Sequence, residues 1–117
     1  MIENILPPVV DGQTKVLIVG SMPGVQSLEK QQYYGNPRNH FWGIIGEITG
    51  EIVPEQYEKR LALVKKHGIG LWDVIRECER VGSLDSNIKN EIPNNFFALF
   101  EQYPQIEAIF FNGTKAH

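Results

Sequence analysis

The chain has 117 residues, the length of one ordinary domain and hardly enough for two. Apolar residues make up 42% of it and charged residues 21%, which fits a globular protein and argues against a disordered or collagen-like chain. A net charge of -3 argues against a protein whose whole surface binds nucleic acid, but it leaves room for one local basic patch.

The cysteine and histidine content limits the metal sites that the chain can form, and together with the N-terminus it indicates the cellular compartment. The single cysteine, Cys78, cannot form an internal disulfide, a cysteine-based zinc site or an iron–sulfur cluster, and the histidines show no metal-ligand spacing. No apolar run approaches the roughly 20 residues of a membrane span. The N-terminus carries an acid and two prolines where a signal peptide would have a basic start and an apolar stretch. The sequence therefore predicts a metal-free cytoplasmic protein that does not enter a membrane.

The first predicted element is a strand at residues 15–20. This run is apolar, lacks polar alternation and ends on Gly20, which predicts a fully buried, central strand of a parallel sheet. Residues 21–37 contain several glycines and prolines and no sustained period, so they predict a long loop with room for one helical turn. A loop of this length in a compact domain is usually functional.

Two helices are predicted next. Apolar side chains recur at steps of three and four from Asn39 to Gly50. The stripe consists of Phe41, Trp42, Ile44, Ile45 and Ile48. A second helix is predicted to begin with Pro54 at its first position and to end at Gly68. Its buried stripe comprises Tyr57, Leu61 and Val64.

The second half of the chain is predicted to return to the sheet. Residues 69–75 fit either a short strand or a helix start. Asp73 and Asp85 are expected to be helix or turn caps, and the alternative is a pair of carboxylates across a cleft. Asn94 or Asn95 is predicted to cap a third helix, which Pro104 ends. Its apolar residues are Phe96, Phe97, Leu99 and Phe100.

Residues 106–111 predict a second buried strand, so the order of elements indicates an α/β fold with a parallel sheet. Thr114 has the character of a helix N-cap, yet three residues remain after it. The 117 residues therefore predict a single domain that lacks its C-terminal portion. The apolar strand 106–111 is then expected to be exposed on one edge or face.

Two segments carry candidate site residues. Gly20-Ser21-Met22-Pro23-Gly24 follows the first strand, where parallel α/β folds bind ligands, although a simple tight turn explains it equally well. It matches neither the dinucleotide-binding glycine pattern nor a Walker loop. Residues 33–42, YYGNPRNHFW, combine aromatic rings, amides and an arginine, which suit stacking on a planar base, reading its edge and meeting a phosphate. Alternatively, Phe41 and Trp42 belong to the core and Asn39 caps the helix that follows, a role that can coexist with a functional one.

Together these segments resemble the uracil-DNA glycosylase superfamily, and most closely its hypoxanthine-DNA (deoxyinosine) glycosylase branch. The resemblance runs from Lys15 to Ala116 and rests on the order and spacing of four motifs. They are GSMPG with Ser27, YYGNPRNHFW, GLWDVIRECERVGSLDSNIKNE and FFNG. It implies a three-layer α/β/α domain that removes a deaminated base from double-stranded DNA without a metal or cofactor.

The resemblance also implies roles for individual residues. Asn39, just before the Phe-Trp pair, matches the catalytic asparagine of the hypoxanthine branch. Tyr34 matches the aromatic residue that stacks on the extruded base in the mismatch-specific uracil/thymine glycosylases, which are more distant relatives. Asn112 matches the amide of the second motif, which contacts the base or assists catalysis. The loop from Gly20 through Ser21, Met22 and Pro23 to Gly24 is the expected base-binding loop. Ser27, Arg38 and Lys115 are the candidates for contacts with the DNA backbone.

The chain departs from the family pattern at several positions. Met22 stands where other branches carry an Asp or Asn that orients water, and Asn36 replaces the usual histidine. The family's last motif, a loop that wedges the duplex open, lies beyond His117. The 117 residues alone are therefore expected to lack glycosylase activity.

The chemistry expected of these residues is stabilisation of the leaving base. An amide orients water but is a poor proton acceptor, so hydrogen-bond donation to the departing base is expected to dominate over general-base action. The backbone N–H groups of Ser21 and Gly24 are further candidate donors. Two alternatives remain: excision of uracil or thymine from mismatches, and a non-catalytic α/β module that binds nucleotides or nucleic acid.

Overall fold

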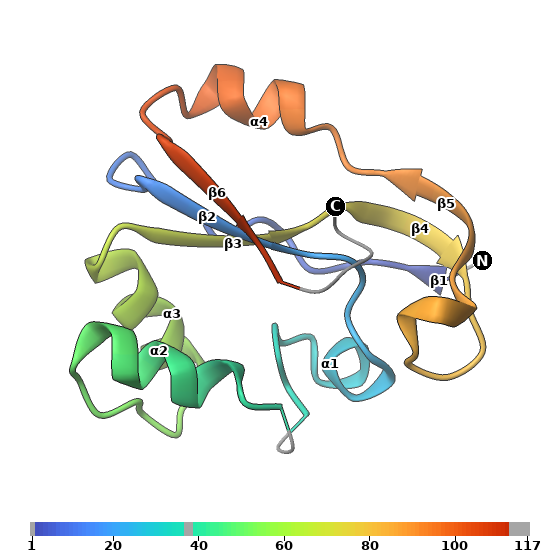
Figure 1. Cartoon of the computed structure of the whole chain (residues 1–117), viewed down its shortest axis with the longest axis horizontal. Coiled ribbons are helices and arrows are strands. Elements are labelled where there is room, and N and C mark those ends of the chain that lie inside the picture. The colour runs from blue at the N-terminus through green and yellow to red at the C-terminus, as the bar shows by residue number, and fades with distance from the viewer. Residues whose placement is uncertain (1, 37–38, 113–117) are drawn as a thin grey trace.

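The computed structural model of the chain describes residues 2–36 and 39–112 (Figure 1). At its centre is a three-stranded parallel sheet in the order β3-β2-β6. These strands are β2 (Val16–Gly20), β3 (Ile69–Asp73) and β6 (Ala108–Phe111). The prediction of a central parallel strand at residues 15–20 is confirmed, and residues 69–73 prove to be a strand.

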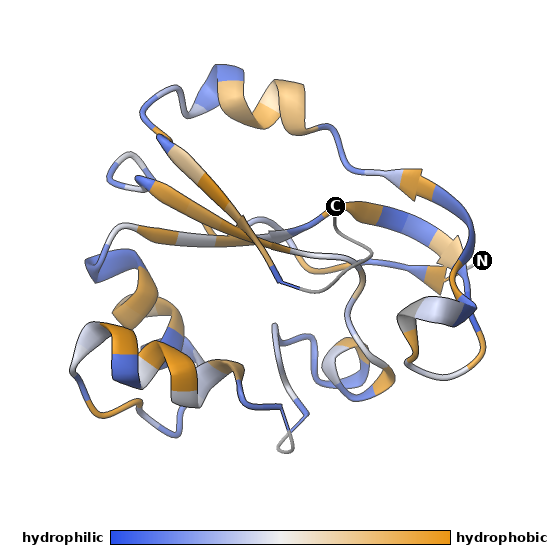
Figure 2. Cartoon of the chain, in the orientation of Figure 1, coloured by the Kyte–Doolittle hydropathy of each residue, from blue (hydrophilic) through white to orange (hydrophobic). Residues whose placement is uncertain are grey.

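Helices cover both faces of this sheet. Leu17 and Val19 pack with Leu99 of α4 (Phe96–Gln102) on one face. Ile18, whose side chain points the other way along the strand, packs with α2 (Phe41–Thr49) and α3 (Tyr57–Lys66). Figure 1 shows α4 on one side of the sheet and α2 and α3 on the other, and Figure 2 shows that hydrophobic residues follow the parallel strands. This is a three-layer α/β/α arrangement.

A second sheet, which the sequence did not predict, extends from the end of β3. It is antiparallel, in the order β1-β4-β5. Its strands are β1 (Ile2–Glu3), β4 (Ile75–Glu79) and β5 (Lys89–Pro93). A 3-10 turn, η1 (Asp85–Asn87), lies between β4 and β5. Leu28 of α1 (Val25–Lys30) packs against a small core that includes Ile75 and Cys78, so α1 joins this sheet to the loop that follows β2.

Helix boundaries differ from the sequence prediction in part. α2 ends before Gly50 as predicted, because Gly50 adopts the left-handed conformation (φ 70°) that glycine tolerates. The predicted helix is confirmed, and Phe41, Trp42 and Ile45 are its buried residues. Ile44 and Ile48 of the same apolar pattern are 51% and 67% exposed. α3 begins at Tyr57 rather than at Pro54, whose carbonyl instead accepts a hydrogen bond from Arg60 Nε at 2.7 Å. Asn95 caps α4 by accepting from the backbone N–H of Ala98 at 3.0 Å.

The strand β6 is exposed, contrary to the prediction of a buried strand. Ile109, Phe110 and Phe111 are 39%, 60% and 50% exposed. β6 pairs with β2 on one edge, and among the described residues no strand pairs with its other edge. The sequence is apolar enough for a buried strand, but burial also requires neighbouring elements on both sides. The exposed apolar side chains agree with the other prediction made for this strand, which is that one of its edges or faces is exposed.

We expect this strand to promote self-association, because an unpaired apolar edge is a template for pairing with another chain. Sedimentation velocity at rising concentrations measures this association. Phe110→Lys should shift the protein towards the monomer. Ile52→Lys is the matched control, because Ile52 is 95% exposed in the loop between α2 and α3. Association that persists in Phe110→Lys but falls in Ile52→Lys would contradict the prediction.

None of the helices in the described ranges is both long and apolar enough to cross a membrane.

Candidate active site

The three parallel strands end at one edge of the sheet, and polar groups gather there. Gly20 ends β2, Asp73 ends β3, and Asn112 directly follows β6, where its N–H donates to the carbonyl of Val19 at 2.8 Å. Carboxyl ends of parallel strands are the usual position of ligand sites in α/β folds. The strand order therefore brings together residues that are up to 92 positions apart in the chain.

Two adjoining pockets form a cleft at this edge. The first, about 90 Å³, is lined by Gly20, Met22, Pro23, Gly24, Ser27, Tyr33, Tyr34, Asn39 and Asp73. The second, about 300 Å³, is lined by Ser21, Met22, Gly24, Val25, Gln26, Ser27, Tyr34, Asn36, Asn39, Ser83 and Asn112. Because Tyr34, Asn39 and Gly24 line both pockets, the cleft brings the loop of residues 20–24 together with Tyr34, Asn39 and Asn112.

Tyr34 occupies a strained backbone position in the cleft. Its φ of 53° lies in the left-handed region. Bulky residues rarely adopt this conformation, and those that do are concentrated at functional sites. Its ring stacks on Phe41, with centroids 3.7 Å apart and planes 12° from parallel. Burial raises the pKa of its hydroxyl to about 12; a hydrogen bond with Asn112 lowers this pKa and the charge of Asp73 raises it. Tyr34 is therefore a neutral phenol near neutral pH.

Asn39 has one polar atom committed to the fold. Its Oδ1 accepts a hydrogen bond from the backbone N–H of Phe41, the first residue of α2, at 2.8 Å. The N-cap residue of α2 is His40, so the prediction that Asn39 is the N-cap is wrong by one position. The other polar atom of the amide is Nδ2, which can only donate. Asn39 is exposed and lines both pockets, so it is suited to donate a hydrogen bond within the cleft.

Asp73 belongs to the candidate site, although the sequence favoured a helix or turn cap over a carboxylate at a cleft. It does not cap a helix, because it ends β3, and it lines the first pocket. Its side chain is buried (4% exposed), and Asn4 Nδ2 donates to its Oδ2 at 3.0 Å. Assigning residues 69–73 to a strand would have revealed it, since its position then matches the ends of β2 and β6.

Some predicted site residues have structural partners, and others cannot be located. The hydroxyl of Ser27 is buried and accepts a hydrogen bond from the N–H of Gly35 at 2.9 Å, which fixes the loop that carries Tyr34. Its contact with the DNA backbone stays a prediction. Arg38 and Lys115 lie outside the described residues. The side chain of Met22 packs into the small core beside α1, and that core also contains Ile75 and Cys78.

The close packing around Gly20 gives a test of the cleft. A Cβ atom at this position would lie 2.7 Å from Asp73 Oδ1 and 3.4 Å from the hydroxyl of Tyr34. Gly20→Ala should therefore displace both groups and destabilise the protein by about 1–3 kcal/mol, the usual cost of overpacking.

Urea unfolding measures this change, and Gly43→Ala is the matched control. Gly43 lies in α2, and nothing lies within 4 Å of the position that a Cβ atom would take there, so alanine should stabilise the helix by up to about 1 kcal/mol. Equal stability of the two variants would show that the packing around Gly20 does not constrain the cleft.

The described residues contain no group of three or more His, Cys, Asp or Glu side chains that could hold a metal ion.

Comparison with known proteins gives consistent results. The profile of the Uracil DNA glycosylase superfamily matches residues 7–117. A hypoxanthine DNA glycosylase of Methanosarcina acetivorans is 47% identical over 117 residues, which cover 99% of this chain and 74% of the relative. One of Methanosarcina barkeri is 44% identical over 111 residues, covering 94% and 70% of the two chains. A solution NMR structure from M. acetivorans, assigned to the uracil DNA glycosylases, superposes with a TM-score of 0.88 at 47% identity and covers 99% of this chain and 73% of that chain.

Proposed function

The chain belongs to the Uracil DNA glycosylase superfamily, and we propose that it hydrolyses the N-glycosidic bond of hypoxanthine in double-stranded DNA, as the first step of base excision repair. The observation that carries the proposal is the convergence of Tyr34, Asn39 and Asn112 on one cleft with the loop of residues 20–24. The identity to two hypoxanthine DNA glycosylases supports the choice of base.

The base must leave the duplex to reach this cleft. Extrusion costs a few kcal/mol, least for a mispaired base such as hypoxanthine opposite thymine. The extruded base stacks on the ring of Tyr34, which is held in place by Phe41 on one side and by the hydrogen bond with Asn112. Stacking on an aromatic ring contributes about 1–3 kcal/mol per base and does not depend on metal or cofactor chemistry.

Bond cleavage places negative charge on the base. The bond between C1′ of the sugar and N9 breaks, its electron pair stays on the base, and the oxygen of a water molecule bonds to C1′. One proton of that water ends on the base and the other stays on the new hydroxyl. Asn39 stabilises the departing base by donating from Nδ2, since its Oδ1 is engaged with Phe41. This geometry favours leaving-group stabilisation over activation of water by Asn39.

Asp73 gives the site a means of recognising deamination. Adenine has a hydrogen-bond acceptor at N1, whereas hypoxanthine has an N1–H donor. A carboxylate can accept from that donor and repels the lone pair of adenine N1. Uracil likewise carries an N3–H where cytosine has an acceptor, so Asp73 also favours uracil excision as the second candidate activity. Guanine keeps an N1–H, but its pairing with cytosine opposes extrusion.

The test is excision from a labelled duplex that carries one inosine. The complete natural product of the gene is incubated in excess over the duplex, abasic sites are cleaved with alkali, and residues 1–117 are assayed separately. The proposal predicts cleavage at inosine by the complete protein and none at adenine. Cleavage at uracil alone would select the second activity, and binding without any cleavage would identify a nucleic-acid-binding module.

Two finer points belong to the same proposal. Contacts of Arg38, Lys115 and Ser27 with DNA phosphates would position the duplex over the cleft. The reducing cytoplasm is the proposed site of action, because the one cysteine, Cys78, is fully buried and packs as a small apolar residue.

A further inference from the structure

Arg80 is a buried cation next to the loop that forms the cleft. It follows β4, is 7% exposed, and donates from Nη2 to the carbonyl of Pro23 at 2.6 Å. Pro23 belongs to the loop of residues 20–24 and lines the first pocket of the cleft. The guanidinium therefore lies directly behind the wall of the proposed base site.

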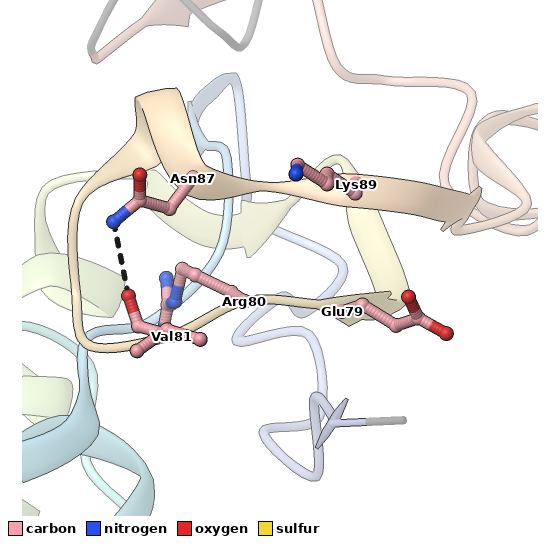
Figure 3. A pocket seen from close by; sticks show the side chains of 5 residues that line it. All are labelled: Glu79, Arg80, Val81, Asn87 and Lys89. Atoms are coloured by element: carbon pink, nitrogen blue, oxygen red, sulfur yellow. Dashed lines mark hydrogen bonds between the residues drawn. The ribbon is translucent and has the colours of Figure 1, made fainter.

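Among the described residues, two of the three guanidinium nitrogens of Arg80 make no hydrogen bond. In the part of the chain that the structure describes, its Nε and Nη1 are buried without a hydrogen-bond partner. Arg80 also borders a separate pocket of about 360 Å³, with Glu79, Val81, Asn87 and Lys89 (Figure 3). The carboxylate of Glu79 points away from the guanidinium and accepts from Asn90 Nδ2 at 3.0 Å.

Such an arrangement is costly for folding. A buried guanidinium loses its hydration, and its unpaired donors add a further penalty. Costs of this kind persist at sites where they serve function. What Arg80 offers is a strong, charge-assisted hydrogen bond to one peptide group of the loop.

We propose that Arg80 is a positioning residue for the glycosylase reaction. Its guanidinium fixes the Pro23–Gly24 peptide and polarises this peptide toward the departing base, which carries the electron pair of the broken bond. A cation on the carbonyl of Pro23 strengthens the N–H of Gly24 as a donor, because the two groups belong to one resonant peptide unit. Gly24 lines both pockets of the cleft. The inference rests on the proposed function and adds a source of positive potential behind the base site.

The test compares two leaving groups of nearly the same shape, hypoxanthine and 2-fluorohypoxanthine, in single-turnover excision by the complete protein. The fluorinated base is the better leaving group because fluorine withdraws electrons from its anion. Arg80→Met should slow hypoxanthine excision by about 10- to 100-fold. This is the order of the effect on the rate that a unit charge near a partly buried site, or one oxyanion-type donor, usually has. The loss should be clearly smaller for 2-fluorohypoxanthine, which needs less stabilisation, and Arg80→Lys, which keeps the charge, should restore most of the rate.

Urea unfolding separates this role from a structural one. Arg80→Met removes a buried charge with two unpaired donors, so its midpoint should be no lower than that of the wild type. An unfolded or strongly destabilised Arg80→Met protein, or equal slowing of both bases, would overturn the proposal in favour of a structural role. An unchanged rate would overturn it as well. If the wild type excises neither base, the proposed function itself fails, and that result is distinct from any effect of Arg80.

Discussion

Replacing Asn39 by serine should slow hypoxanthine excision by roughly 100-fold or more, the usual cost of losing one oxyanion-type donor, while stability stays near that of the wild type. A serine hydroxyl accepts from the N–H two residues on, as an asparagine side chain does, so it can replace Oδ1 as the acceptor for the N–H of Phe41. Serine keeps one O–H donor, but this hydroxyl is bonded to Cβ and does not reach the position of the two N–H groups of Nδ2 in the cleft. Single-turnover rates with the inosine duplex measure the first effect, and urea midpoints measure the second.

Asn39→Ala separates the two contributions of this side chain. Alanine removes both the acceptor for the N–H of Phe41 and the donor, so it should lose activity like serine and in addition about 1 kcal/mol of stability. Binding to the inosine duplex should change little in either variant, because Asn39 acts on the charge that develops during bond cleavage. A serine variant with the wild-type rate would show that Nδ2 does not assist the departing base.

Much of the fold follows from patterns that are local in the sequence. The unbroken apolar run before Gly20 predicts β2, and steps of three and four residues predict α2, whose end at Gly50 depends on a conformation that glycine allows. An asparagine cap at position 94 or 95 is recognisable from the side chains, and the structure assigns it to Asn95. These signals depend on single residues and their neighbours, which the sequence displays directly.

Features that depend on distant partners could not be predicted. β4 and β5 are short and carry charged residues, so their pairing depends on a register that leaves no clear period in the sequence. The exposure of Phe110 depends on which elements lie beside β6, and its hydropathy predicts only that it could be buried.

The candidate site shows the same division. Tyr34, Asn39 and Asn112 stand in motifs that a family resemblance makes visible, and β2 and β6 bring two of these motifs to one edge of the sheet. Asp73 and Arg80 gain their significance from burial, one at the end of β3 and the other behind the loop after β2. Burial of a charged side chain is a property of the folded chain, so no residue spacing in the sequence predicts it.

Asp73→Asn should reduce both the rate on hypoxanthine and the selectivity against adenine. The carboxylate only accepts hydrogen bonds, whereas an amide can turn to present either its oxygen or its N–H groups. Loss of one hydrogen bond to a charged group predicts a fall of about 10- to 100-fold in hypoxanthine excision. Adenine excision should stay the same or rise, because an amide N–H can meet adenine N1 where the carboxylate repels it.

Asn4 provides a second, milder variant of the same site. Asn4 Nδ2 donates to Asp73 Oδ2 at 3.0 Å and to the carbonyl of Ile75 at 3.2 Å, so Asn4→Ala leaves the carboxylate in place but less firmly oriented. Its rate should fall less than that of Asp73→Asn, and its discrimination against adenine should persist because the negative charge remains.

The control for this series is Glu101→Gln, the same carboxylate-to-amide change on an exposed residue of α4. Rates on inosine and adenine duplexes are measured for all three variants under single-turnover conditions. Recognition by Asp73 requires that selectivity fall in Asp73→Asn and remain in Asn4→Ala and Glu101→Gln. If Asp73→Asn keeps the wild-type ratio of hypoxanthine to adenine excision, the buried carboxylate serves the packing around Gly20 and Tyr34, and another group in the cleft distinguishes the two bases.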